Sequence, residues 1–158
     1  HISNSDKFVS LNAQINAANI GTHNIRKYHD VNCLIINESE LRHELRQRDG
    51  NVEEMAVTLK NMVNSKYIAV TQGREGAFLI NGGKAKQRSP GFAAQVIDKI
   101  GSGDALLAIL SVCLYNNLDE KLSLFIGSLA AGQSVETVGN SVPVSKTKLL
   151  KTISHLLK

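Results

Sequence analysis

Residues 96–110 of this 158-residue chain read VIDKIGSGDALLAIL. Three small residues, 101–103, separate an extended segment from an apolar run with helical spacing, and a single carboxylate, Asp104, opens that run. Glycines before a helix often form only a tight turn, and the helix dipole favours an acid in the first turn of any protein. Taken alone, the stretch therefore predicts a turn into a helix more readily than it predicts a binding site.

The same stretch also has a functional interpretation. Backbone N–H groups of residues 101–103 would point outward at the start of the helix, where the dipole and the donors both favour an anion. Their small side chains would let a phosphate come within hydrogen-bonding distance of the main chain. Asp104 would stand beside that phosphate, able to accept a proton from an attacking hydroxyl. Phosphoryl transfer needs alignment, charge stabilisation and a base, and little else.

Apolar runs of strand length alternate with helical segments along the chain. We expect strands at 7–12, 33–37 and 67–71 and on both sides of the Asn81-Gly82-Gly83 turn, and an extended piece at 94–98. We expect a helical turn at 24–28 and helices from an N-cap at Ser39 to about 49, from Asn51 to about 64, and at 104–116, 119–135 and 145–157. This pattern predicts one α/β domain over residues 1–158, with a mainly parallel sheet flanked by helices.

The composition excludes several classes of protein. Hydrophobic residues make up 42% and charged residues 20% of the chain, as in soluble globular proteins. The net charge is +4, but the basic residues are scattered and Trp is absent, so nucleic acid is not an expected partner. No apolar run has the roughly twenty residues of a membrane span. Cys33 and Cys113 lie in apolar runs and are expected to be buried thiols of a cytoplasmic protein.

Polar residues follow the two buried runs that end at 37 and 71. Asn37 and Glu40 could present a carbonyl and a carboxylate to hydrated Mg²⁺ at the sheet edge where α/β proteins usually bind ligands. A helix capped by Ser39, with acids in its first turn, explains the same residues without a ligand and is the simpler explanation in isolation. The segment TQGREG at 71–76 is a glycine turn that alone decides nothing.

The order of these segments is more specific than any one of them. N-x-x-E at 37–40, T-x-G-x-x-G at 71–76, D-x-x-G-S-G-D at 98–104 and AAGQSVETVG at 130–139 follow one another, each at a strand end or a helix start. In this order they resemble the PfkB family of ribokinase-like carbohydrate kinases, over about residues 31–145. The resemblance implies the C-terminal, nucleotide-binding half of that fold. It also implies transfer of the ATP γ-phosphoryl group to a hydroxyl of a sugar or sugar phosphate.

Individual roles follow from the same resemblance. Asp104 matches the catalytic base, and Asn37 and Glu40 match the motif that organises Mg²⁺ through water. The residues that match the anion hole for the transferring phosphoryl group are Gly101, Ser102 and Gly103. The residues that match the nucleotide site, in the glycine turn and where small residues admit the adenine, are Thr71, Gly73, Gly76, Gly127, Ala131 and Gly132.

Two departures from the family pattern lie in the signature itself. Ser102 stands where the family commonly has Ala, and it is harmless because backbone N–H groups bind the anion. Asp98 matches an acid that the family associates with a monovalent-cation site. Lys99 follows it where the family commonly has Thr, and an ammonium there would repel or replace K⁺.

Two longer stretches point weakly to a subfamily. AAGQSVETVGNSVPVS at 130–145 looks like the corresponding stretch of heptose-phosphate kinases that supply nucleotide-activated heptose. SLNAQINAANIGTHNIRKY at 10–28 is similar to kinases fused to a sugar cytidylyltransferase. Neither stretch identifies the sugar.

Members of the family are roughly twice as long as this chain, and their N-terminal half carries most sugar contacts and the lid. The chain begins with His1 instead of Met, so we expect a processed chain or a fragment that lacks that half. Such a chain should bind ATP or ADP weakly and show no useful turnover alone. The missing half should leave an apolar seam that favours a homodimer. The alternatives are a non-catalytic kinase-like module that binds a ligand or partner, and a related kinase of vitamin precursors.

Overall fold

The computed structural model describes residues 7–12, 24–82, 86–93, 95–98, 100–136, 138 and 141–156. One sheet has its strands in chain order: β1 (Ser10–Asn12), β2 (Cys33–Asn37), β3 (Tyr67–Thr71), β4 (Ala77–Asn81) and β5 (Lys86–Ser89). β1, β2 and β3 are parallel to one another. The connections from β3 to β4 and from β4 to β5 are too short for a crossover, so these neighbours run antiparallel. The predicted α/β class is confirmed, with a sheet that is parallel in its first three strands.

The helices are α1 (Glu38–Leu45), α2 (Val52–Met62), α3 (Ser102–Tyr115), α4 (Glu120–Ser134) and α5 (Lys146–Leu156), with 3₁₀ turns η1 (Ile25–Lys27) and η2 (Gly73–Glu75). The chain forms two compact units. The first contains His1–Gln72 and Phe78–Gln87, and the second contains Gly73–Ala77 and Arg88–Lys158. The single domain expected from the sequence stays a prediction.

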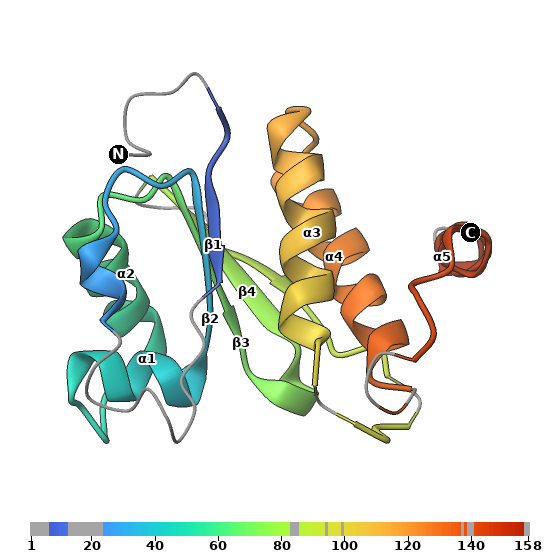
Figure 1. Cartoon of the computed structure of the whole chain (residues 1–158), viewed down its shortest axis with the longest axis horizontal. Helices are drawn as coiled ribbons and strands as arrows, with labels where there is room; N and C mark the ends of the chain where they lie inside the picture. The colour runs from blue at the N-terminus through green and yellow to red at the C-terminus, as the bar shows by residue number, and fades with distance from the viewer. Residues whose placement is uncertain are drawn as a thin grey trace. The chain divides into compact units, whose positions relative to one another are not determined.

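The core of the first unit lies between the sheet and the pair α1 and α2, which cover one face of it (Figure 1). Alternate strand residues such as Leu34, Ile36 and Ile68 pack in this cluster. The residues between them are buried as well: Cys33 and Ile35 are 0% and 1% exposed. Both faces of the central strands are therefore apolar, which is why these strands appear in the sequence as continuous apolar runs.

The start and end of α1 differ from the prediction. Asn37, not Ser39, is the N-cap, because its side chain accepts a hydrogen bond from the N–H of Glu40 at 2.8 Å. The helix ends at Leu45, several residues early, since Arg46 turns into the left-handed region at a φ of 55°. The cap predicted for α2 is confirmed: the Asn51 side chain accepts from the N–H groups of Glu53 and Glu54.

The second unit contains α3 and α4, which pack side by side (Figure 1). Leu106, Leu110 and Leu114 recur every four residues on α3 and are buried. Residues 95–98, the described part of the extended piece predicted at 94–98, belong to no strand of the sheet. There the N–H groups of Ile97 and Asp98 both donate to the carbonyl of Val135, just beyond α4. Within the described ranges, no helix has the length and apolar character to cross a membrane.

Candidate functional site

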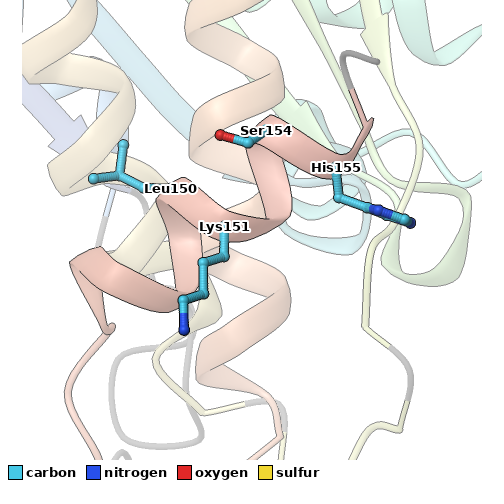
Figure 2. Close-up of a pocket in the computed structure, with 4 residues that line it drawn as sticks. All are labelled: Leu150, Lys151, Ser154 and His155. Atoms are coloured by element: carbon cyan, nitrogen blue, oxygen red, sulfur yellow. The ribbon is translucent and has the colours of Figure 1, made fainter.

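A shallow hollow runs along α5 and is lined by Leu150, Lys151, Ser154 and His155 (Figure 2). All four side chains come from one helix, and none belongs to the residues that the sequence singles out. A small-molecule site needs polar groups that converge from several elements around an enclosed space. The residues that the sequence singles out lie elsewhere: at the ends of β2 and β3 in the first unit, and in the glycine turn, at the start of α3 and on α4 in the second.

The ends of β2 and β3 bring two of the predicted motifs together. Asn37 and Thr71 are direct partners in the parallel ladder, each the last residue of its strand. Parallel strands end at the same edge of a sheet, and ligands of α/β proteins usually bind at that edge. The first residues of N-x-x-E and T-x-G-x-x-G are therefore neighbours, although they are far apart in the sequence.

Asn37 and Glu40 form a reciprocal capping box at the start of α1. Asn37 Oδ1 accepts from the N–H of Glu40 at 2.8 Å, and Glu40 Oε2 accepts from the N–H of Asn37 at 3.0 Å. Both side chains thus have a structural role. This supports the explanation by helix capping, although the cap is Asn37 and not Ser39. The box also fixes both oxygens at the sheet edge, so a structural and a ligand-organising role are compatible.

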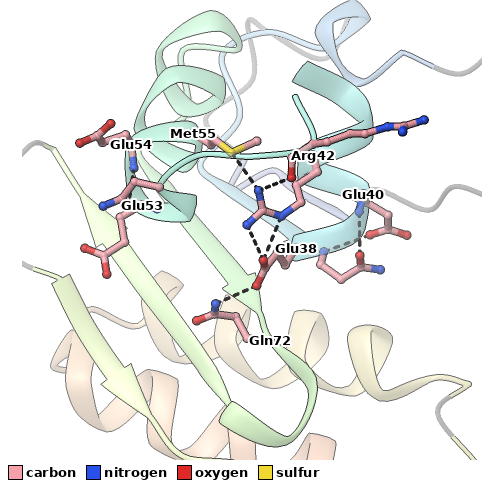
Figure 3. Close-up of polar contacts among 10 residues, drawn as sticks. Glu38, Glu40, Arg42, Glu53, Glu54, Met55 and Gln72 are labelled. Atoms are coloured by element: carbon pink, nitrogen blue, oxygen red, sulfur yellow. Dashed lines mark hydrogen bonds and ion pairs between the residues drawn. The ribbon is translucent and has the colours of Figure 1, made fainter. Parts of the chain in front are cut away.

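Sequence reasoning missed a polar bridge beside these residues. Glu38 Oε1 accepts from Nε and Nη2 of Arg42 at 3.0 and 2.7 Å, and Glu38 Oε2 accepts from Nε2 of Gln72 at 2.9 Å (Figure 3). The hydrogen bond from Gln72 and the contacts with Arg42 lower the pKa of the Glu38 carboxyl from its usual value. The bridge joins α1 to the residue that follows β3.

In the second unit, the turn after Gln72 depends on two glycines in the left-handed region. Gly73 has a φ of 60° and Gly76 a φ of 90°, and the N–H of Gly76 donates to the Gly73 carbonyl at 3.2 Å. A side chain on Gly76 would also meet the Ser89 carbonyl, because a Cβ there would lie 2.1 Å from that oxygen. A Cβ on Gly73 would have nothing within 4 Å. Gly76 therefore packs closely against the end of β5.

The residues after β5 continue from this turn to α4. A Cβ on Gly91 would lie 2.9 Å from the Arg74 carbonyl, so this segment contacts the turn. The Phe92 ring meets the Phe125 ring edge-on, with centroids 5.3 Å apart. A Cβ on Gly132 would lie 3.2 Å from the backbone of residues 92–93. The glycine turn and the small residues of α4 thus belong to one continuous packed layer of the second unit.

The small residues of α4 have packing reasons of their own. A Cβ on Gly127 would lie 2.9 Å from Leu106 Cδ1, so this glycine lets α3 and α4 approach closely. Gly132 admits the backbone of residues 92–93 in the same way. Ala131 is half-buried between them on the helix. The role in admitting adenine, which the family resemblance implies for these three residues, stays a prediction.

The start of α3 differs from the starts of α1, α2 and α4. Those three helices are capped by the side chains of Asn37, Asn51 and Asp119. Gly101, the N-cap of α3, lies in the left-handed region at a φ of 85° and makes no side-chain cap. Ser102 and Gly103 follow in the first turn, and Asp104 is exposed there. A small residue therefore occupies the position where the other helices use a polar side chain.

Asp98 is fixed near the start of α3 by one local and one long-range hydrogen bond. Its Oδ1 accepts from the N–H of Ile100 at 2.9 Å, and its own N–H donates to the Val135 carbonyl at 3.2 Å. Lys99, whose ammonium is expected to repel or replace a cation at Asp98, lies outside the described residues. A monovalent cation at Asp98 stays a prediction.

The cysteines agree only partly with the prediction. Cys33 is buried in β2, and burial raises the pKa of its thiol to about 12. Cys113 on α3 is only partly buried, and burial raises its thiol pKa as well. Both are free thiols.

Comparison with known proteins identifies the family of this chain. A model of the pfkB family of carbohydrate kinases matches residues 11–147. The bifunctional protein HldE of Methylobacillus flagellatus is 31% identical over 129 residues, which cover 78% of this chain and 25% of that protein. HldE of Magnetococcus marinus is 29% identical over 118 residues, which cover 73% of this chain and 24% of that protein. The chain thus spans about a quarter of the length of these curated relatives.

Solved structures share the fold. Ribokinase from Thermotoga maritima matches 96% of this chain and 50% of its own, with a TM-score of 0.78 and 20% identity. Arabidopsis thaliana ribokinase, solved with ribose and ATP, matches 77% of this chain and 40% of its own, with a TM-score of 0.68 and 23% identity. These likenesses confirm the predicted ribokinase-like α/β fold.

Proposed function

Because the chain belongs to the pfkB family of carbohydrate kinases, we propose that it is the nucleotide-binding and catalytic-base half of an ATP-dependent sugar kinase. The acceptor is a hydroxyl of a sugar or sugar phosphate, and the protein acts in the cytoplasm. The observation that carries the proposal is the start of α3. There a left-handed glycine without a side-chain cap precedes an exposed carboxylate, Asp104.

The proposed step uses two groups of this chain. The acceptor hydroxyl oxygen bonds to the γ-phosphorus of ATP while the bond from that phosphorus to the β–γ bridging oxygen breaks, and ADP leaves. The hydroxyl proton passes to the carboxylate of Asp104. Backbone N–H groups at residues 101–103 stabilise the negative charge on the transferring group, helped by the positive end of the helix dipole. The proton acceptor and the anion site are thus supplied by one turn of one helix.

Mg²⁺ would be organised at the ends of β2 and β3. Mg²⁺ prefers oxygen ligands, keeps several waters and is usually held by one or two carboxylates together with substrate phosphates. Glu40 and Asn37 fit this pattern through water, because the capping box fixes their oxygens. No group of three or more His, Cys, Asp or Glu side chains in the described part of the chain could hold a metal ion by itself. When bound, the ion neutralises charge on the phosphates.

The capping box makes the test of Asn37 sharper. Asn37→Ala removes the cap and should cost about 0.5–2 kcal/mol of stability, whatever the protein does. Asn37→Ser keeps a capping oxygen but loses the amide carbonyl. If Asn37 organises Mg²⁺, both variants of the complete kinase should lose about 10–100-fold in turnover at limiting Mg²⁺. A Ser variant with wild-type turnover beside an impaired Ala variant would leave Asn37 with a capping role only.

The chain matches 50% of the Thermotoga maritima ribokinase structure, and the other half of such a fold is the partner that this function requires. The exposed apolar side chains of α3 support that requirement. Val112 and Tyr115 are 61% and 63% exposed, and Ala108, one turn before Val112, is exposed as well. The same face of the helix begins at Asp104. A homodimer that covers this face stays a prediction.

Without that half, the 158 residues should bind MgATP weakly and show no useful turnover. Orientation of two reactants accounts for about 7–11 kcal/mol of a barrier, and a chain without the acceptor pocket lacks that contribution. We expect a dissociation constant of about 1 mM, or about −4 kcal/mol, by calorimetric titration. A folded sample that gives no heat with MgATP would instead favour the non-catalytic binding module.

A further inference from the structure

We propose that Glu38 is a positioning residue of the nucleotide site, which acts through Gln72 to fix the point where the T-x-G-x-x-G turn leaves the sheet. The inference rests on the function proposed above and adds a residue to that site. Glu38 lies outside the family motif positions in N-x-x-E, and its carboxylate is held by Arg42 on α1 and by Gln72, the residue after β3 (Figure 3).

The first step of the argument is that Glu38 is itself held rigidly. Arg42, which donates twice to Glu38, uses its remaining nitrogen on the carbonyl of Arg48 at 2.9 Å and near the Met55 sulfur at 3.8 Å. The guanidinium is planar, so these contacts fix its orientation together. Glu38 is thereby tied to α1, to the connection after it and to α2.

The second step is that the bridge restrains the turn at the end where it leaves β3, whereas the close packing of Gly76 against Ser89 restrains its far end. Gln72 is bonded to Thr71, the last residue of β3, and to Gly73, the first residue of η2. Glycines at 73 and 76 have the largest backbone entropy to lose, and within the turn the Gly76 N–H donates to the Gly73 carbonyl. A side-chain bond at Gln72 therefore restrains the turn at its origin. Such preorganisation lowers the cost of ordering the turn when a nucleotide binds.

The third step is that the hydrogen bond between Gln72 and Glu38 has a donor and an acceptor, which a double substitution can exchange. Glu38 only accepts hydrogen bonds, and the Gln72 amide donates one to it. Gln72→Glu opposes two carboxylates and breaks the bridge. Adding Glu38→Gln restores a Gln–Glu hydrogen bond with donor and acceptor exchanged, still leaves an oxygen for Arg42, and returns the local charge to its wild-type value. Gln72→Met breaks the bridge without adding charge.

The experiment measures amide hydrogen exchange at residues 72–77 in the nucleotide-free chain, and the MgATP dissociation constant of the same samples. Gln72→Glu and Gln72→Met should each speed exchange about tenfold and weaken MgATP binding about tenfold. Glu38→Gln combined with Gln72→Glu should return both values to within about threefold of wild type. Glu38→Gln combined with Gln72→Met should not. The matched control is Glu53→Gln, which breaks the ion pair with Lys86 on the same unit and should change neither value.

The outcomes separate this inference from the proposed function. Exchange that is unchanged in Gln72→Met, or a reversed pair no better than Gln72→Glu alone, overturns the positioning role. Altered exchange with unaltered MgATP affinity also overturns it, because the bridge would then be structural only. If the wild-type chain binds no MgATP, the proposed function fails. The role of the bridge in a nucleotide site is then refuted as well. Faster exchange in the variants would show only that the bridge orders the turn.

Discussion

Asp104→Asn should lower the turnover of the complete kinase about 10²–10⁴-fold, equivalent to roughly 3–5 kcal/mol, with ATP affinity little changed. Asn has nearly the shape of Asp but cannot accept the hydroxyl proton. Asp104 is exposed in the first turn of α3, where Asn fills the same space. The substitution should therefore leave the fold intact and act on the chemical step, which steady-state rates at saturating ATP will measure.

Asp119→Asn is the matched control for this experiment. Asp119 is also an acid at a helix start, and its Oδ1 accepts from the N–H of Leu122 at 2.9 Å. Asn caps helices about as well as Asp, so this variant should keep both stability and turnover. Unchanged turnover in Asp104→Asn would remove that residue from the mechanism.

Gly76→Ala should destabilise the chain by about 3 kcal/mol or more. Two independent costs combine at this position. A residue with a side chain pays about 1–2 kcal/mol in the left-handed region, and a Cβ would lie 2.1 Å from the Ser89 carbonyl and 2.5 Å from the carbonyl carbon of Pro90. Backbone cannot move aside as a flexible side chain can, so the turn must shift away from residues 89–91. Urea unfolding followed by circular dichroism measures the loss.

Gly73→Ala separates the two costs. Gly73 has a φ of 60°, but its Cβ would have nothing within 4 Å. This variant should lose only the conformational share, about 1–2 kcal/mol. Equal losses in the two variants would mean that Gly76 is required for its φ alone. The close packing against Ser89 would then make no contribution to the free energy of unfolding.

The sequence predicted β2 and β3 to the residue, because strands buried on both faces leave apolar runs with sharp polar ends. Cys33–Asn37 and Tyr67–Thr71 end where Asn and Thr begin the polar turns. The cap of α2 at Asn51 was predictable for a similar local reason. These features depend on residues that are close together in the chain.

The error at α1 and the contact that was not foreseen at 95–98 have different causes. Asn37 and Ser39 are both good caps, and the spacing of Asn37 and Glu40 was the signal that could have decided between them. At 95–98, the N–H groups of Ile97 and Asp98 bond to Val135, a residue distant in the sequence. No local pattern indicates that contact, so the sequence predicted an extended piece there without its partner.

The composition of the candidate site was predictable only in part. The order of the motifs named every residue of the two glycine-rich segments, whose roles in a site stay predictions. The bridge from Glu38 to Gln72 could not, because it requires knowing that Asn37 and Thr71 are register partners. The packing that requires glycine at 127 and 132 could not be predicted from the sequence either, because it depends on neighbours from α3 and from residues 92–93.

Nuclear magnetic resonance of the 158-residue chain, titrated with MgATP and separately with AMP and Mg²⁺, tests the central claim most directly. If the first turn of α3 holds the terminal phosphate, the amide signals of Gly101, Ser102 and Gly103 should shift with MgATP and stay in place with AMP. Amide signals at 101–103 that never move while others report saturation by MgATP would contradict the account.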